Sequence, residues 1–325
     1  MNEGLVIFSD DKTISYINKM ACGVFSFTKN NSENDTPAFL SLCRNAEYAR
    51  ILEDAFAGRS GFSKMADSNH VYLLSANAVE TELGLYGAVL FVLDITEKEM
   101  NEEMRKEFTA NVSHELKTPL TSIMGYAEII ENGIAKTEDT KEFAGKIHKE
   151  ASRLLTVIED IIRLSQFDEN KIKDEFNNVD LYGLCETVID QLSLKARGEN
   201  VSLSLEGGRV FVNGIKSVLG DMIYNLCDNG INYNKNNGTV VINLSENDGK
   251  IILSVKDSGI GVARVHQSRV FERFYRVNKS RSKESGGTGL GLSIVKHGAQ
   301  LHKAEIQFES ALDAGTEVRI LFNSQ

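Results

Sequence analysis

The chain has 325 residues, of which 42% are hydrophobic and 25% are charged, and its formal net charge is −10. This length exceeds what one typical hydrophobic core organises, so we expect two or three domains. The negative charge argues against direct binding to nucleic acid, because no basic region offsets it.

The cysteines and the hydropathy pattern bear on the cell compartment. Four cysteines lie far apart without a C-x-x-C pair: Cys22, Cys43, Cys185 and Cys227. They are interpreted as reduced, structural thiols. No apolar run approaches the roughly 18 residues of a membrane span, and the start lacks the basic segment of a signal peptide. The chain as given is expected to be cytoplasmic, and an upstream membrane anchor in a longer parent protein is left open.

Residues 1–96 alternate short β-patterns with turn signals. The segments "EGLVIF" and "TISYIN" flank the turn "SDDK", and "HVYLLSANAV" and "LYGAVLFVLDI" follow. A helical stretch broken by Asn and Ser separates the two pairs. This pattern predicts a small α+β domain.

Residues 97–170 carry two long helical patterns joined by a short polar loop. Thr96 and Glu99 fit a capping box at the start of the first helix. Apolar residues then recur every four positions, and His114 lies roughly 160° away from that stripe, toward solvent. Pro119 interrupts the helix five residues after His114, although a proline inside a helix costs roughly 3 kcal/mol. One antiparallel hairpin cannot enclose a core, so pairing with a second copy into a four-helix bundle is expected.

Residues 171–325 show a mixed α/β pattern that predicts a third domain. Six strands are predicted, "VSLSLE", "RVFVNG", "TVVINLSE", "KIILSVKD", "EIQFES" and "TEVRILF", with helices at about 216–234 and 292–302. The fold class is therefore multidomain α+β.

The helix at 216–234 bears a row of polar side chains on one face. Asp221, Asn225, Asn229 and Tyr233 are spaced four apart, opposite an apolar face. Amide oxygens suit a magnesium–phosphate site, because hard cations take oxygen ligands and keep several waters. Taken alone, an exposed polar face is the more common reading.

Two glycine-rich segments follow this helix. "VKDSGIGV" places Asp257 after a strand, before Gly259 and Gly261, where a carboxylate can accept a hydrogen bond from an exocyclic amine such as that of adenine. "SGGTGLGLSIVKH" packs Gly286, Gly287, Gly289 and Gly291 before a helix, an arrangement that offers backbone N–H groups to phosphates. Between them, "VFERFYRVNKSRS" suits a mobile lid over a nucleotide. Each segment alone also fits a simple turn, a loop or core packing.

The order of these motifs after a helix with an exposed histidine resembles the sensor histidine kinases of two-component systems. The resemblance covers about residues 97–325, and its most specific motif is "SHELKTPL". It implies a helical phosphoacceptor domain at 97–170 and an ATP-binding α/β sandwich at 171–325. Gyrase-type ATPases and heat-shock chaperones share the glycine-loop domain but lack the histidine motif.

The resemblance also implies roles for individual residues. His114 would be the phosphoacceptor, Glu115 its acid/base and orienting neighbour, and Thr118 would position water for dephosphorylation of the partner. Asn225 would ligate Mg²⁺, with Asn229 and Tyr233 beside the phosphates of ATP. Asp257 would read adenine in a pocket shaped by Gly259 and Gly261, and Arg276 would approach the γ-phosphate. The phosphates would be cradled by Thr288, Gly289, Leu290 and Gly291.

Several positions depart from the family pattern. Asn232 stands where a lysine is common, which puts one cation near the phosphates in doubt. Gly230 replaces a usual alanine and Ala263 a usual proline, and "LHKAEI" lacks the usual paired glycines. None of these changes touches His114 or Asn225, so activity is expected to survive.

Residues 1–96 resemble a PAS sensor module, which binds a small ligand or mediates dimer contacts. The resemblance as a whole implies a homodimeric protein-histidine kinase that uses ATP and Mg²⁺. It would autophosphorylate and pass the phosphoryl group to an aspartate of a response regulator receiver domain, with regulator phosphatase activity as well. The alternatives are a non-catalytic scaffold that binds ATP without transfer, and an ATPase that only hydrolyses.

Overall fold

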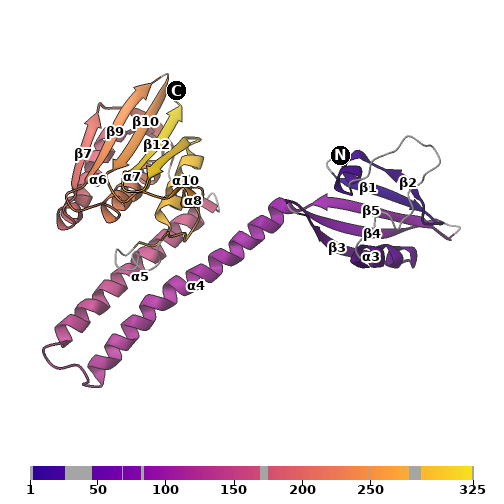
Figure 1. Cartoon of the computed structure of the whole chain (residues 1–325), viewed down its shortest axis with the longest axis horizontal. Helices are drawn as coiled ribbons and strands as arrows, with labels where there is room; N and C mark the ends of the chain where they lie inside the picture. Colours follow the sequence, from indigo (N-terminus) through magenta and orange to yellow (C-terminus); the bar gives the residue numbers. More distant parts are fainter. Residues whose placement is uncertain are drawn as a thin grey trace. The chain divides into compact units, whose positions relative to one another are not determined.

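The structure is a computed structural model that divides into two compact units, Met1–Glu107 and Phe108–Gln325 (Figure 1). The described residues are 3–25, 46–67, 69–81, 84–168, 175–247, 249–277 and 287–323. Within them, no helix has both the length and the apolar character that a membrane span requires.

The N-terminal unit is built on one antiparallel sheet of five strands in the order β2-β1-β5-β4-β3. Its elements are β1 (Gly4–Ser9), β2 (Ile14–Ile17), α1 (Lys19–Val24), α3 (Ala46–Phe56), β3 (Gly61–Ala66), β4 (Val71–Thr81) and β5 (Gly84–Asp94). Alternate residues of β1 are buried, so Val6 and Phe8 face the core with Leu90 of β5. Helix α3 packs on β3, β4 and β5, and α1 packs on β1. The predicted strands are confirmed, and β3 is an additional strand.

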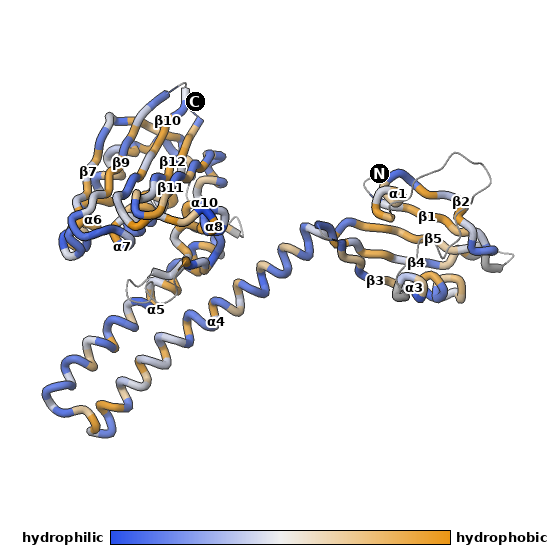
Figure 2. Tube along the Cα trace, viewed as in Figure 1, coloured by the Kyte–Doolittle hydropathy of each residue, from blue (hydrophilic) through white to orange (hydrophobic). Residues whose placement is uncertain are grey.

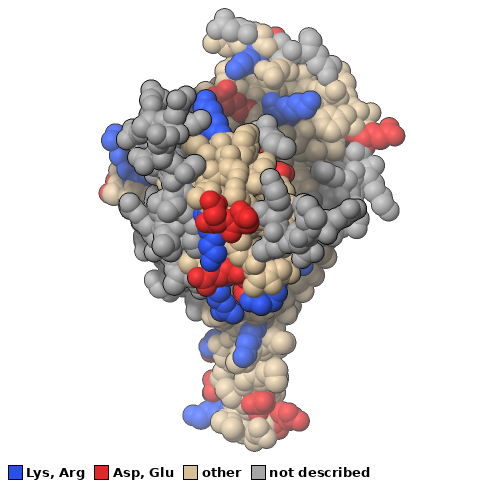
Figure 3. Space-filling model, turned by 90° about the vertical axis from the view of Figure 1, so that its right-hand side faces the viewer, with Lys and Arg blue, Asp and Glu red and all other residues tan. Residues whose placement is uncertain are grey.

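The strands of this unit are more hydrophobic than the helix that follows them. In Figure 2, β1 and β5 are mainly hydrophobic, whereas much of α4 (Thr96–Glu131) is hydrophilic. In Figure 3, acidic and basic side chains are interspersed among the coloured residues.

Helix α4 begins at Thr96, but the predicted capping box is wrong. The Thr96 hydroxyl donates to Asp94 Oδ1 at 2.5 Å and accepts from the backbone N–H of Val71 at 2.9 Å. The Glu99 carboxylate pairs with Lys64 Nζ at 2.6 Å instead of turning back to the helix start. Asp94 Oδ1 also accepts from the Thr96 N–H, so the carboxylate caps the helix.

Helices α4 and α5 (Thr140–Asp168) form the predicted antiparallel hairpin. Gly133 ends α4 with φ +64°, the left-handed conformation that glycine favours at a helix end. Pro119 is buried inside α4, which continues through it as one helix (Figure 1). Side-chain hydroxyls near the proline donate to the carbonyl four residues earlier: Ser113, Thr118, Thr121 and Ser122. Such bonds bend helices slightly.

The rest of the C-terminal unit is an α/β sandwich. A five-stranded sheet has the order β11-β12-β10-β9-β7, antiparallel except for the β7–β9 pair, and β6 pairs with β8 in a second sheet. Helices α6, α7 and α10 pack on strands of the main sheet. The elements are β6 (Asn177–Asp180), α6 (Leu181–Gly198), β7 (Ser202–Gly207), β8 (Phe211–Gly214), α7 (Lys216–Asn232), β9 (Thr239–Asn247), β10 (Lys250–Asp257), α8 (Arg264–Gln267), α10 (Gly291–Leu301), β11 (Glu305–Ala311) and β12 (Gly315–Asn323).

Helix α6 is absent from the sequence prediction. The carboxylate of Asp180 caps it by accepting from the backbone N–H groups of Tyr182 and Gly183. Leu184, Val188 and Leu192 then recur every four residues and are buried. Both signals are present in the sequence, so this helix could have been predicted.

Candidate active site

His114 lies on the exposed side of α4, as its position relative to the apolar stripe predicted. A shallow cavity of about 500 Å³ adjoins it, lined by His114, Lys117, Thr118, Thr121 and Ser122. The Thr118 hydroxyl donates to the His114 carbonyl at 3.1 Å. The imidazole is therefore accessible to a reaction partner.

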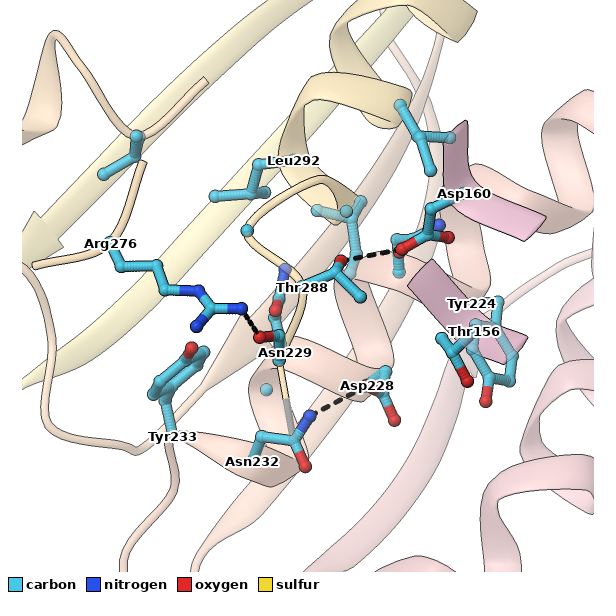
Figure 4. Close-up of a pocket in the computed structure, with 18 of the residues that line it drawn as sticks. Thr156, Asp160, Tyr224, Asp228, Asn229, Asn232, Tyr233, Arg276, Thr288 and Leu292 are labelled. Atoms are coloured by element: carbon cyan, nitrogen blue, oxygen red, sulfur yellow. Dashed lines mark hydrogen bonds between the residues drawn. The ribbon is translucent and has the colours of Figure 1, made fainter. Parts of the chain in front are cut away.

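A second, larger cavity of about 1250 Å³ lies in the same unit, between α5 and the α/β sandwich (Figure 4). It brings together most of the predicted nucleotide-binding residues: Asn225, Asn229, Tyr233, Asp257, Gly261, Arg276, Thr288, Gly289 and Gly291. Leu290 is instead fully buried and packs with Leu164 of α5 and Ile294 of α10. Gly259 does not line the cavity but supports the turn beside it.

The turn after β10 holds Asp257 at the cavity wall. Asp257 Oδ1 accepts from the N–H of Gly259 at 2.8 Å and from that of Thr316 at 3.2 Å. Burial raises the pKa of this carboxyl, and the two backbone bonds oppose that effect. Gly261 has φ +63°, and a Cβ there would lie 1.8 Å from the Ala311 carbonyl oxygen. Only glycine permits this close approach.

Asn225 has the geometry of a single oxygen ligand. Its Nδ2 donates to the Asp221 carbonyl at 2.8 Å, which fixes the orientation of the side-chain amide. A Cβ on Gly291, the first residue of α10, would lie 2.6 Å from Asn225 Oδ1, so this glycine keeps the oxygen uncrowded. The described residues contain no cluster of three or more His, Cys, Asp or Glu side chains able to hold a metal. One amide oxygen fits Mg²⁺, which usually takes its other ligands from phosphates and water.

Arg276 is almost fully buried between the glycine loop and α4. Its Nη2 donates to the Gly287 carbonyl and lies 3.6 Å from Glu115 Oε2. Burial lowers the pKa of this guanidinium, whereas the charge of Glu115 raises it. Figure 4 shows Arg276 beside Tyr233, pointing toward the loop that carries Thr288. Arg276, which was predicted to approach the γ-phosphate, therefore lies next to Glu115, the residue that follows His114.

The described aromatic residues of the predicted lid are packed. Phe271 meets Phe308 edge-on with 5.7 Å between ring centroids, and Phe274 lies 5.7 Å from Phe108 of α4. Tyr275 Oη lies 2.7 Å from a ring nitrogen of His266. The part of the lid from residue 278 onward and Gly286 lie outside the described residues.

Helix α5 places an acidic side chain on the glycine loop, which the sequence analysis did not foresee. Thr288 Oγ1 donates to Asp160 Oδ2 at 2.7 Å (Figure 4). Burial raises the pKa of Asp160 to about 6, although the Thr288 bond opposes the shift. Nearby, Arg163 pairs with Asp221 at 2.7 Å. No local motif in the sequence marks these contacts.

A lysine side chain lies near Asn232, the position at which the family commonly has a lysine. Asn232 Nδ2 donates to Asp228 Oδ2 at 2.8 Å (Figure 4), and Lys195 of α6 pairs with the other oxygen of Asp228. Lys195 lines the same cavity. The fold thus supplies a lysine from another helix near the position where the sequence lacks one.

Comparison with known families matches both parts of this site. Residues 104–170 match the His Kinase A (phospho-acceptor) domain, and residues 214–325 match the "Histidine kinase-, DNA gyrase B-, and HSP90-like ATPase" family. This chain belongs to the sensor histidine kinase family. The two matched domains occur in one chain here, with the phosphoacceptor domain first.

Individual relatives extend the comparison. Sensor histidine kinase WalK of Bacillus subtilis is 27% identical over 324 residues, which are 98% of this chain and 53% of the relative. Sensor-like histidine kinase SenX3 of Mycolicibacterium smegmatis is 35% identical over 230 residues, covering 70% of this chain and 60% of the relative. The chain spans about half the length of the relatives that match it throughout.

Two solved structures share the fold. Histidine kinase ThkA, solved in complex with response regulator protein TrrA, aligns with TM-score 0.54 and 21% identity over 99% of this chain and 96% of that chain. Acinetobacter baumannii histidine kinase AdeS aligns with TM-score 0.54 and 21% identity over 65% of this chain and 98% of that chain.

Proposed function

We propose that this protein is an ATP-dependent protein-histidine kinase that phosphorylates itself on His114 and passes the phosphoryl group to an aspartate of a response regulator. One observation carries the proposal. An exposed histidine on α4 and a cavity with the residue types that bind a nucleotide occur in the same compact unit.

The chemistry follows from these residues. A ring nitrogen of His114 forms a bond to the terminal phosphorus of ATP, and the bond from that phosphorus to the bridging oxygen breaks, so that the electron pair leaves with ADP. The imidazole proton passes to Glu115, the adjacent carboxylate. Phosphoryl transfer depends mainly on positioning and on charge neutralisation. In the proposed assignment, Asp257 receives adenine, Thr288 and the glycine loop hold the phosphates, and Arg276 neutralises the terminal phosphate.

Mg²⁺ would be held by Asn225 together with phosphate oxygens and water, and it would neutralise phosphate charge. Asn229 and Tyr233 extend the same face of α7 along the phosphates. Thr118 would position a water when the protein acts as a regulator phosphatase.

We propose that the partners bind to the surface of the hairpin. Exposed apolar side chains occur on both helices: Leu120, Met124, Leu155, Ile158 and Ile162. Burying them against a second copy would form the dimeric four-helix bundle. A receiver domain as partner is supported by ThkA, which was solved with its response regulator protein. The antiparallel sheet with its packed helices supports a PAS-like sensor role for residues 1–96, which would bind a small ligand or mediate dimer contacts.

The test uses the full chain with γ-labelled ATP and Mg²⁺. We expect a label that is acid-labile and alkali-stable, absent from His114→Gln, and transferable to a receiver domain. Label that survives His114→Gln would reject the site. Nucleotide binding without any label would instead support a non-catalytic scaffold, and phosphate release without label would support an ATPase.

A further inference from the structure

Arg153 of α5 is a charged residue at this site to which neither the sequence motifs nor the family resemblance gives a role. Its side chain is 12% exposed, and its Nη2 lies 3.4 Å from Glu115 Oε2. Arg276 approaches the same oxygen, at 3.6 Å. A single carboxylate oxygen is therefore shared by two guanidinium groups.

This arrangement has a surplus of positive charge and of hydrogen-bond donors. Two cations share one anion, and both distances exceed the 2.7–2.9 Å of a strong charge-assisted bond. The Nε of Arg153 is buried and has no hydrogen-bond partner among the described residues. A buried donor without a partner costs about 1–3 kcal/mol, more when charged. If the ion pair were purely structural, nothing would offset the free-energy cost of this unpaired donor.

The surplus charge lies where a phosphoryl group must pass. Arg153 and Arg276 both line the cavity that holds Asn225 and Asp257, and their shared carboxylate belongs to the residue next to His114. Their two Nη2 atoms are at most 7.0 Å apart, because their distances to Glu115 Oε2 are 3.4 Å and 3.6 Å. One phosphate can offer separate oxygens to two guanidinium groups at this spacing.

We propose that Arg153 is a further catalytic residue, which together with Arg276 binds the phosphoryl group while it moves from the nucleotide to His114. The inference rests on the proposed kinase function. The terminal phosphate displaces the Glu115 carboxylate from the two arginines, so Glu115 becomes able to take the imidazole proton. The arginines form and break no covalent bond; they neutralise the charge on the oxygens of the group in transit.

The test compares Arg153→Gln and Arg153→Lys in the full chain. We measure the single-turnover rate of labelling from γ-labelled ATP and, separately, the affinity for ADP, which lacks the terminal phosphate. We expect Arg153→Gln to slow labelling on the order of 100-fold and to leave ADP affinity within about twofold. Arg153→Lys should recover part of the rate, since it keeps the charge but not the planar fork.

Lys146→Gln is the matched control. Lys146 lies two turns earlier on α5 and pairs with Glu142 at 2.6 Å, so its removal also breaks a carboxylate pair on that helix. It should label at the wild-type rate. If Arg153→Gln is too unstable to assay, Arg153→Lys provides the test. We expect Arg153→Lys to label more slowly than the wild type while its melting temperature is unchanged.

Three results for Arg153→Gln would overturn the inference. These are an unchanged labelling rate, a faster labelling rate, as expected if the ion pair only restrains the kinase, and a loss of ADP affinity as large as the loss of rate. Absence of label in the wild-type chain would instead reject the proposed kinase function.

Discussion

The contact between Asp160 and Thr288 predicts a pH-dependent competition for the glycine loop. Asp160 is held against the loop with its pKa raised from 3.8 to about 6, chiefly by burial. When α5 and the loop separate, the carboxyl regains its ordinary pKa. The associated state thus binds more protons between about pH 4 and 6, so the association weakens as pH rises through that window.

The size of the effect follows from the shift. A difference of about 2 pKa units corresponds to about 3 kcal/mol, as an upper value, above pH 6. Asp160→Asn removes this cost but keeps a side-chain oxygen that can accept from Thr288. At pH 7.5 the variant should hold the loop more tightly, and a nucleotide that needs Thr288 should bind up to about 100-fold more weakly than to the wild type.

The assay is calorimetric binding of a non-hydrolysable ATP analogue to the full chain between about pH 4 and 8. The ratio of wild-type to variant affinity is compared, because titration of the nucleotide itself cancels in that ratio. It should be near one below about pH 4, on the order of 10 at pH 5, and level off above about pH 6. Glu142→Gln, which removes an exposed carboxylate of α5 outside the cavity, should show no such trend. A ratio that stays constant from about pH 4 to 8, or tighter binding by Asp160→Asn, would refute the reasoning.

Three further predictions concern the nucleotide site and the phosphoacceptor helix. Gly261→Ala places a Cβ against the Ala311 carbonyl at a positive φ, so we expect at least a tenfold loss of adenine-nucleotide affinity in a fluorescence titration; wild-type affinity would contradict this. Asn225→Ala should abolish the difference in ATP affinity between Mg²⁺ and EDTA, and a persisting difference would place the metal ligand elsewhere. Pro119→Ala should stiffen α4, raise its stability by up to about 3 kcal/mol and change the ratio of kinase to phosphatase rates; two unchanged rates would remove the role proposed for the proline.

Local patterns in the sequence were sufficient for most elements. Alternating apolar residues predicted most strands of the two five-stranded sheets, since one face of each strand is buried, whereas β3 and β6 were not predicted. The row of polar residues on α7 and the turn at Gly261 were also readable, because spacing along one helix or a required backbone conformation is a local property. Helix α6 was missed although its cap and its apolar spacing are both present.

Tertiary structure alone decided which distant side chains meet. Asp94 and Lys64 took the groups that a local capping box would have used. Arg153, 38 residues from Glu115, and Asp160, 128 residues from Thr288, reach their partners only because α5 packs against α10 and extends side chains to α4 and to the glycine loop. An ion pair between such positions leaves no periodic trace in a single sequence, because its geometry depends on how separately formed helices and loops pack together.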